Sequence, residues 1–290
     1  MPASPTAEVP EPAPARPRRA AALVRASVAL HGAAAAALLV RPQWWPWALG
    51  TVVADHLLLT AAGLWPRSRL LGPNWTRLPP AVAGAVALTI DDGPDPEVTP
   101  RALALLEQHG ARATFFCVGE RVARHPQLAR RILGEGHAIG NHSQRHLHRF
   151  SLLGPAALGR EVGRAQEIIR DVTGTAPRFF RAPAGLRNVF LEPVLARAGL
   201  QLVSWTRRGF DTVSPDGARV LGRLTRGLRG GDILLLHDGH AARAAGGTPV
   251  ILEVLPQLLA ALGSAGLSAV ILPEAFARVQ ALGAATAVPS

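Results

Sequence analysis

The chain has 290 residues, 48% of them hydrophobic, which allows one large domain with an appendage. Its formal net charge is +11 and all of the positive charge comes from arginine, but the arginines are scattered instead of forming a basic stripe with interleaved aromatics, which argues against a nucleic-acid partner. The single cysteine, Cys117, excludes an intramolecular disulfide and lies in an apolar run typical of a buried thiol.

The N-terminal region is predicted to be a tail followed by two apolar helices. Residues 1–19 are rich in Pro, Ala and Glu, a composition typical of disorder. Two apolar stretches follow, at about residues 20–40 and 47–65, each near the roughly 20 residues that span a bilayer as a helix. We interpret residues 20–66 as a transmembrane hairpin or anchor, with a cleaved signal peptide and a soluble apolar helical pair as the alternatives.

Charged residues bear on this interpretation. Asp55 falls within the second stretch, where a central aspartate costs about 2.5–3.5 kcal/mol on insertion scales, and His31 could partner it if the two helices form a hairpin. Arginines flank the outer ends of both stretches, against only Arg41 between them, so the positive-inside rule places both ends in the cytoplasm. The predicted location is a bacterial-type inner membrane, and an anionic membrane surface or an anionic lipid-linked substrate suits the positive charge.

Strand and helix patterns alternate after a linker at residues 67–83. Strands are expected near residues 85–90, 113–118, 137–141, 178–181, 200–204, 233–237 and 268–272, with helical patterns between several of them. This order predicts parallel strands with helices packed outside, and seven such units indicate an incomplete or distorted (β/α) barrel at residues 84–275, before a C-terminal tail at 276–290. Barrels of this kind carry their chemistry at the carboxyl ends of the strands.

Polar clusters follow the predicted strands, and the first two could form a metal site. Asp91 and Asp92 follow the first strand; because successive side chains point to opposite sides, one could bind a metal while the other acts as a base, and an Asx-type turn is the structural alternative. His142 and His146 are four residues apart, one helical turn, and could reach one ion. An aspartate and two histidines would give a metal ion three protein ligands and leave coordination positions open for water and substrate. The alternative explanation of the spacing is that the two histidines simply lie on the surface. His148 is a further ligand candidate with poorer spacing.

The later clusters add an arginine, an aspartate and another histidine. Arg181 ends an apolar strand and is expected to pair with a buried carboxylate, for which Asp91 is the obvious partner, and the turn after it could present backbone N–H groups to an oxyanion. His237 ends the most hydrophobic strand, where it could be a core histidine or, near a metal, a general acid oriented by Asp211. Three other histidines are interpreted as structural or surface groups: His125, His137 and His240.

Five clusters in this order resemble the motifs of the polysaccharide deacetylase family, the NodB homology domain or carbohydrate esterase family 4. They are Thr89–Pro94, His142–His146, Arg181–Gly185, Asp211 and Leu235–His237. The resemblance covers about residues 84–275 and implies a distorted (β/α)7 barrel of NodB type. It also implies removal of N- or O-acetyl groups from sugars with one divalent metal, commonly zinc, with cobalt, nickel or manganese as alternatives.

The resemblance implies a role for each matching residue. The catalytic positions are Asp91 as base, Arg181 as the group that positions it, His237 as acid and Asp211; the metal ligands are Asp92, His142 and His146; the substrate-contacting positions are Ala184, Gly185, Leu235 and Thr212. Ala184 and Thr212 stand where the family has aromatic residues, so the acyl pocket and the sugar subsites are expected to differ.

The predicted function is metal-dependent removal of an N-acetyl or other acyl group from an amino sugar of a polysaccharide or a lipid-linked saccharide. A catalytic domain that faces the cytoplasm would suit a lipid-linked sugar, and a periplasmic domain would favour a polymer. Two alternatives remain: a carbohydrate-binding protein of the same fold that has lost catalysis, and a metal-dependent hydrolase of another amide or ester.

Overall fold

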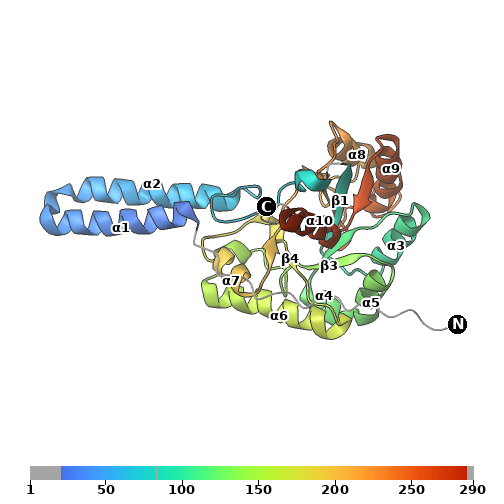
Figure 1. Cartoon of the computed structure of the whole chain (residues 1–290), viewed down its shortest axis with the longest axis horizontal. Helices are drawn as coiled ribbons and strands as arrows, with labels where there is room; N and C mark the ends of the chain where they lie inside the picture. The colour runs from blue at the N-terminus through green and yellow to red at the C-terminus, as the bar shows by residue number, and fades with distance from the viewer. Residues whose placement is uncertain (1–20, 83, 286–290) are drawn as a thin grey trace.

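The computed structural model describes residues 21–82 and 84–285, so the tail predicted at residues 1–19 lies outside the described residues. Two long helices, α1 (Ala22–Val40) and α2 (Trp45–Leu64), lie side by side and extend away from a larger α/β domain (Figure 1). The short turn η1 (Pro42–Trp44) reverses the chain between them. The described chain therefore has the predicted hairpin before a strand-and-helix domain.

The hairpin carries its apolar side chains on the outside. Leu39 is 86% exposed and Trp47 is 79% exposed, a surface that is unfavourable in water and ordinary in lipid. Both helices are long and apolar enough to be candidate membrane spans. Polar groups face each other between them: Ser27 Oγ donates to Asp55 Oδ2 at 2.6 Å, and His31 Nδ1 lies 3.9 Å from the same oxygen. The expected partnership of His31 with Asp55 is thus confirmed.

The domain is built on one sheet of eight strands joined in parallel. They are β1 (Ala85–Asp91), β2 (Thr114–Cys117), β3 (Ala138–Asn141), β4 (Phe179–Phe180), β5 (Gln201–Leu202), β6 (Arg207–Arg208), β7 (Ile233–His237) and β8 (Ser268–Val270). The hydrogen-bonded order is β5-β4-β3-β2-β1-β7-β6, and β8 pairs with the start of β1. This curled, open sheet confirms the predicted distorted barrel. The additional strand, β6, has two residues, too few to give a periodic signal in the sequence.

Helices cover the outside of the sheet (Figure 1). They are α3 (Thr99–Gln108), α4 (Gly119–Arg124), α5 (Pro126–Gly134), α6 (Pro155–Thr173), α7 (Leu191–Arg197), α8 (Gly217–Thr225), α9 (Val250–Ser264) and α10 (Leu272–Ala285), with one-turn 3-10 segments η2 (Pro80–Val82), η3 (Phe150–Leu152) and η4 (Pro183–Gly185). The segment expected to be a C-terminal tail from residue 276 is helical as far as Ala285, because α10 continues to that residue.

Side chains alternate along β1, so that its residues pack into two different cores and its last residue lies on the inner face of the sheet. Val86, Leu88 and Ile90 pack with the outer helices, whereas Ala85 and Ala87 belong to the inner core. Because side chains alternate along a strand, the inward face of β1 ends in a polar residue at its carboxyl end, namely Asp91. The same alternation on β7 places Ile233 and Leu235 inward and brings His237 to the same end.

The segment predicted as a linker packs against the domain. Trp75 forms a bridge with Val203, and its N–H donates to Leu202 O at 2.9 Å. At the base of the hairpin, Arg187 N–H donates to Gly63 O at 3.1 Å. Trp75 therefore pairs with the edge of the sheet next to β5, and a backbone hydrogen bond at Gly63 joins the hairpin to the domain.

Candidate active site

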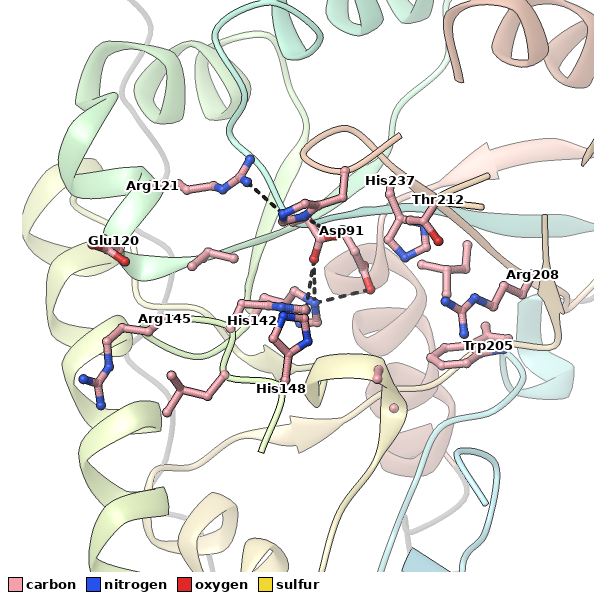
Figure 2. A pocket seen from close by; sticks show the side chains of 18 of the residues that line it. Asp91, Glu120, Arg121, His142, Arg145, His148, Trp205, Arg208, Thr212 and His237 are labelled. Carbon is pink, nitrogen blue, oxygen red and sulfur yellow. Dashed lines mark hydrogen bonds and ion pairs between the residues drawn. The ribbon is translucent and has the colours of Figure 1, made fainter. Parts of the chain in front are cut away.

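A cavity of about 720 Å³ opens at the carboxyl ends of the strands. Figure 2 shows His142 and Asp91 near its centre, with Trp205, Arg208, Thr212 and His237 along one side. The predicted residues that line it are Asp91, Asp92, His142, His146, Ala184, Gly185, Thr212, Leu235 and His237. The other two, Arg181 and Asp211, are buried directly behind the lining. The structure thus gathers all the predicted site residues in one place.

Three residues form a compact donor set within the cavity. Asp92 Oδ1 lies 3.3 Å from His142 Nε2 and 3.2 Å from His146 Nε2. The histidines converge on a turn and not on one helical turn as their spacing suggested: Ser143 and His146 have positive φ, and His146 N–H donates to Ser143 Oγ. The predicted convergence is correct, but its cause is the turn chemistry that follows β3.

The hydrogen bonding of His142 and the pKa of His146 suit a ligand role. His142 Nδ1 lies 2.8 Å from Arg181 O, and an N–H donated to this carbonyl leaves Nε2 as the free nitrogen on the side of Asp92. Burial and the neighbouring His142 lower the pKa of His146 to about 4, so its imidazole is neutral at pH 7. Burial opposes the charge of Asp92, but its contacts with His142 and His240 outweigh burial and hold its pKa well below the usual value.

The donor set fits a divalent cation. Within the described residues, Asp92 Oδ1 is buried without a hydrogen-bond partner, although it faces two imidazole nitrogens. The three ligand atoms lie within 4.8 Å of one another. Two imidazole nitrogens and one carboxylate oxygen are the donors that zinc takes in catalytic sites. These residues can therefore hold one metal ion.

Asp91 is held by a buried arginine. Arg181, 1% exposed, donates from Nη1 to Asp91 Oδ1 at 2.6 Å and to Thr89 Oγ1 at 2.8 Å. Its guanidinium also stacks on the Phe116 ring, 4.2 Å from the centroid. The expected pairing of Arg181 with Asp91 is confirmed. Since this pairing uses Oδ1, the second oxygen of Asp91 remains for chemistry and lies 3.7 Å from His142 Nε2.

His237 is oriented by Asp211 through two contacts. Asp211 Oδ1 lies 2.9 Å from His237 Nδ1, and Asp211 Oδ2 accepts the His237 backbone N–H at 2.7 Å. Burial lowers the pKa of His237, but the adjacent Asp211 carboxylate outweighs burial, so the pKa lies above the ordinary 6.5. With Nδ1–H directed to Asp211, the second ring nitrogen carries the proton that can be given to a substrate.

Within residues 21–82 and 84–285, the turn after β4 has one backbone N–H for which no hydrogen bond is seen. Gly185 N–H donates to Ala182 O and Leu186 N–H donates to Pro183 O, which leaves the Ala184 N–H as the group of this turn that could face an oxyanion. Gly185 has φ +74°, and a Cβ there would lie 2.5 Å from Trp205 and 2.7 Å from Pro66. Glycine is therefore required by both conformation and space.

Two residues that follow His237 were not predicted to belong to the site. His240, interpreted from the sequence as a structural or surface group, is exposed, but it also lines the cavity, and its Nδ1 lies 3.0 Å from Asp92 Oδ2. Asp238 is buried, accepts a hydrogen bond from Thr99 Oγ1, and has its pKa raised by burial to about 7. The sequence feature that could have identified them is their position directly after β7, next to His237. His137 is structural as expected, since its Nδ1 accepts the Ala113 N–H.

Comparisons with known proteins agree with this geometry. A family model described as polysaccharide deacetylase matches residues 80–203. A peptidoglycan-N-acetylglucosamine deacetylase of Bacillus cereus is 36% identical over 175 residues, which cover 60% of this chain and 81% of the relative. A chitooligosaccharide deacetylase of Bradyrhizobium sp. is 40% identical over 157 residues, 54% of this chain and 71% of the relative. A family 4 carbohydrate esterase from Streptomyces lividans, solved in complex with acetate, matches with a TM-score of 0.59 and 32% identity over 66% of this chain and 94% of that one. The chain belongs to the polysaccharide deacetylase family.

Proposed function

We propose that the protein is a metal-dependent deacetylase that hydrolyses the N-acetyl group of an amino sugar. The observation that carries this proposal is the convergence of a base, an acid and a three-residue donor set on one cavity. The names of two relatives, deacetylases of peptidoglycan N-acetylglucosamine and of chitooligosaccharides, support the same reaction class.

Asp92, His142 and His146 would hold one divalent cation, for which zinc suits the donors and cobalt, nickel or manganese are alternatives. Bound there, the ion would supply a Lewis acid for the amide carbonyl and lower the pKa of the attacking water. His148 lines the cavity but is not part of this donor set, which supports His146 as the third ligand.

The residues of the chain divide the proton transfers between them. Asp91, fixed by Arg181, would take a proton from the water as the water oxygen adds to the carbonyl carbon. The Ala184 N–H would donate to the oxygen that becomes negative. His237, fixed by Asp211, would give its proton to the amine nitrogen as the C–N bond breaks, so that acetate and a free amino sugar leave.

The neighbouring positions would shape the acyl pocket and the sugar subsites. Leu235 and Trp205 line the cavity beside His237 and offer apolar surface to an acetyl methyl group. Ala184 and Thr212 also line it, where small side chains leave room that aromatic residues would fill. We propose that these positions, together with Gly185, contact the substrate.

We further propose that residues 20–66 anchor the enzyme in a membrane and that residues 84–275 form its catalytic domain. The exposed apolar side chains of α1 and α2 support the anchor. The arginines at the domain end of the hairpin support a catalytic domain on the cytoplasmic side of the inner membrane.

Acetate release from N-acetylated glycans, measured with and without added Zn²⁺, tests the proposed reaction. The wild-type protein should release acetate only with metal, and His142→Ala should lose both metal binding and release. His109→Ala, an exposed site at the end of α3, is the matched control and should behave as wild type. Stoichiometric metal with no release from any glycan would contradict the deacetylase and favour a binding protein.

A further inference from the structure

A second cavity, of about 620 Å³, adjoins the active site and is unusually basic. Its lining contains five arginines and no acidic residue: Arg207, Arg208, Arg219, Arg223 and Arg226. Arg208 lines both this arginine groove and the active-site cavity, so the two spaces meet at its side chain. Figure 2 shows Arg208 beside Trp205 at the edge of the active-site cavity.

Most of the charge in the arginine groove has no neutralising partner within the part of the chain that the structure describes. Arg207 pairs with Asp232, but that carboxylate also pairs with Arg77, and Arg219 lies 3.6 Å from the exposed Asp216. Among residues 21–82 and 84–285, no carboxylate lies within ion-pair distance of the other three: Arg208, Arg223 and Arg226. The groove therefore carries a net positive charge next to the proposed reaction centre.

Two of these guanidinium groups are held on the same aromatic ring. Arg208 lies 4.9 Å and Arg223 5.3 Å from the centroid of Phe210, and Arg208 also lies 5.5 Å from the ring of Trp205. Arg223 is fixed further by its hydrogen bond to Gly209 O, whereas Arg208 Nε is buried without a hydrogen-bond partner in the described chain. Both cations line the arginine groove, and an anion bound there would offset their charge.

The arginine groove also adjoins the base of the hairpin. Arg67 Nη1 lies 3.4 Å from the carbonyl oxygen of Thr206, which lines the groove, and Ser204 Oγ donates to Pro66 O at 2.5 Å. Pro66 and Arg67 follow α2 directly. If α1 and α2 cross a membrane, these contacts place the Thr206 side of the groove near the level of the lipid phosphates.

We propose that the arginine groove binds the phosphate of a glycosyl phosphate, so that the substrate is an N-acetylated amino sugar carried on a lipid phosphate. This inference rests on the proposed deacetylation: the acetylated sugar would occupy the active-site cavity and its phosphate would contact Arg208 and Arg223. A guanidinium fork matches phosphate oxygens, and a charge-assisted contact is stronger than a neutral hydrogen bond. The groove's position at the hairpin favours a phosphate that arrives from the membrane.

The test compares three substrates that share one sugar, using the full chain in detergent micelles. They are the methyl glycoside of N-acetylglucosamine, N-acetylglucosamine 1-phosphate, and N-acetylglucosamine linked through phosphate to a polyisoprenol. We expect kcat/KM for acetate release to be at least about tenfold higher for the phosphates than for the glycoside, the scale of one charge-assisted contact. We expect a further increase for the lipid-linked sugar.

Variants of the groove identify the residues responsible. Arg208→Gln and Arg223→Gln should each reduce the preference for phosphate over glycoside by about tenfold, and Arg208→Lys should retain part of it because the charge remains. Arg160→Gln, an exposed arginine of α6, is the matched control and should keep the wild-type preference. Equal rates for glycoside and phosphate, or equal losses on all substrates in the variants, would overturn the phosphate site.

Binding separates this proposal from the proposed reaction. Calorimetric titration should show N-acetylglucosamine 1-phosphate binding more tightly than the methyl glycoside, with the difference lost in Arg208→Gln. If this binding is seen while no substrate releases acetate, the reaction is wrong and the phosphate site stands. If acetate is released without any phosphate preference in rate or binding, the reaction stands and the phosphate site is wrong. Equal rates for the soluble and lipid-linked phosphates would overturn the lipid part alone.

Discussion

At the scale of single residues, Arg181 links the proposed base to the donor set. Its guanidinium donates to Asp91, while its backbone carbonyl contacts His142 Nδ1. One buried side chain and its own main chain thereby orient a carboxylate at the end of β1 and an imidazole that follows β3. The orientation is independent of any mobile surface group, because Arg181 is itself fixed by the carbonyls of Val203 and Ser204.

Asp91→Asn should separate catalysis from metal binding. The amide keeps the shape of the side chain but cannot accept a proton from water, so kcat should fall by about 10²–10⁴-fold, the range for a general base. The metal content should stay at the wild-type level, since the ligands are elsewhere. Acetate release and metal analysis check this, with thermal unfolding as a control because the change leaves Arg181 without its buried counter-charge. A near-normal rate would show that Asp91 is not the base.

Asp211→Asn should move the alkaline limb of the pH profile. Asp211 raises the pKa of His237, and the proposed acid must be protonated to act, so activity should decline as pH rises through this pKa. Removing the carboxylate lowers the pKa, and the decline should therefore begin at a lower pH. The profile of kcat against pH measures it. An unshifted alkaline limb would exclude His237 as the titrating acid.

At the scale of elements, the turn η4 depends on a glycine for two separable reasons. Gly185 and Gly174, the residue after α6, have nearly the same positive φ, but nothing lies within 4 Å of a Cβ at Gly174. Gly174→Ala should lower the free energy of unfolding by about 1–2 kcal/mol, the cost of a left-handed residue with a Cβ. Gly185→Ala should cost more, because its Cβ would overlap Trp205 and Pro66.

The same pair of variants tests the turn in catalysis. Gly185→Ala should also reduce acetate release, since the overlap displaces the neighbouring Ala184 N–H, whereas Gly174→Ala should leave the rate unchanged. Denaturant unfolding and kcat measure the two effects. Equal losses of stability in the two variants would mean that the turn η4 has room for a methyl group at residue 185, contrary to the overlap with Trp205 and Pro66.

At the scale of the whole molecule, the hairpin and the catalytic domain are joined by contacts that also reach the cavity wall. Gly63 bonds Arg187, and Pro66 contacts Gly185 at the turn η4. The candidate membrane anchor is thus packed directly against the proposed active site, which restricts the directions from which a substrate can approach.

A reporter at the C-terminus should reveal which side of the membrane the catalytic domain faces. The arginines at both outer ends of the hairpin predict the cytoplasm, so a fused fluorescent protein should fluoresce and a fused alkaline phosphatase should be inactive. Both fusions should remain with the membrane fraction after alkaline washing. Phosphatase activity would place the domain outside the cytoplasm and remove the topological support for a lipid-linked substrate.

Local patterns in the sequence determined much of this protein's fold and the placement of several site residues. The strand patterns predicted that Asp91 and His237 stand at the carboxyl ends of strands, and the order of strands and helices predicted an open barrel with its polar clusters at one end. Hydrophobic length predicted the hairpin, and the charge of Asp55 within it predicted a partner on the other helix. Periodicity and polarity suffice for these features because each depends on neighbours within one element.

Contacts and sites formed by residues far apart in the chain could be found only in the tertiary structure. His240 meets Asp92 across 148 positions, and Arg67 meets Thr206 across 139, and no local pattern encodes either contact. The arginine groove is likewise invisible in the sequence, where its members are mixed with other arginines in a strand and a helix of ordinary amphipathic pattern. The physical reason is that charge becomes a site only when folding brings cations together and leaves their counter-ions elsewhere.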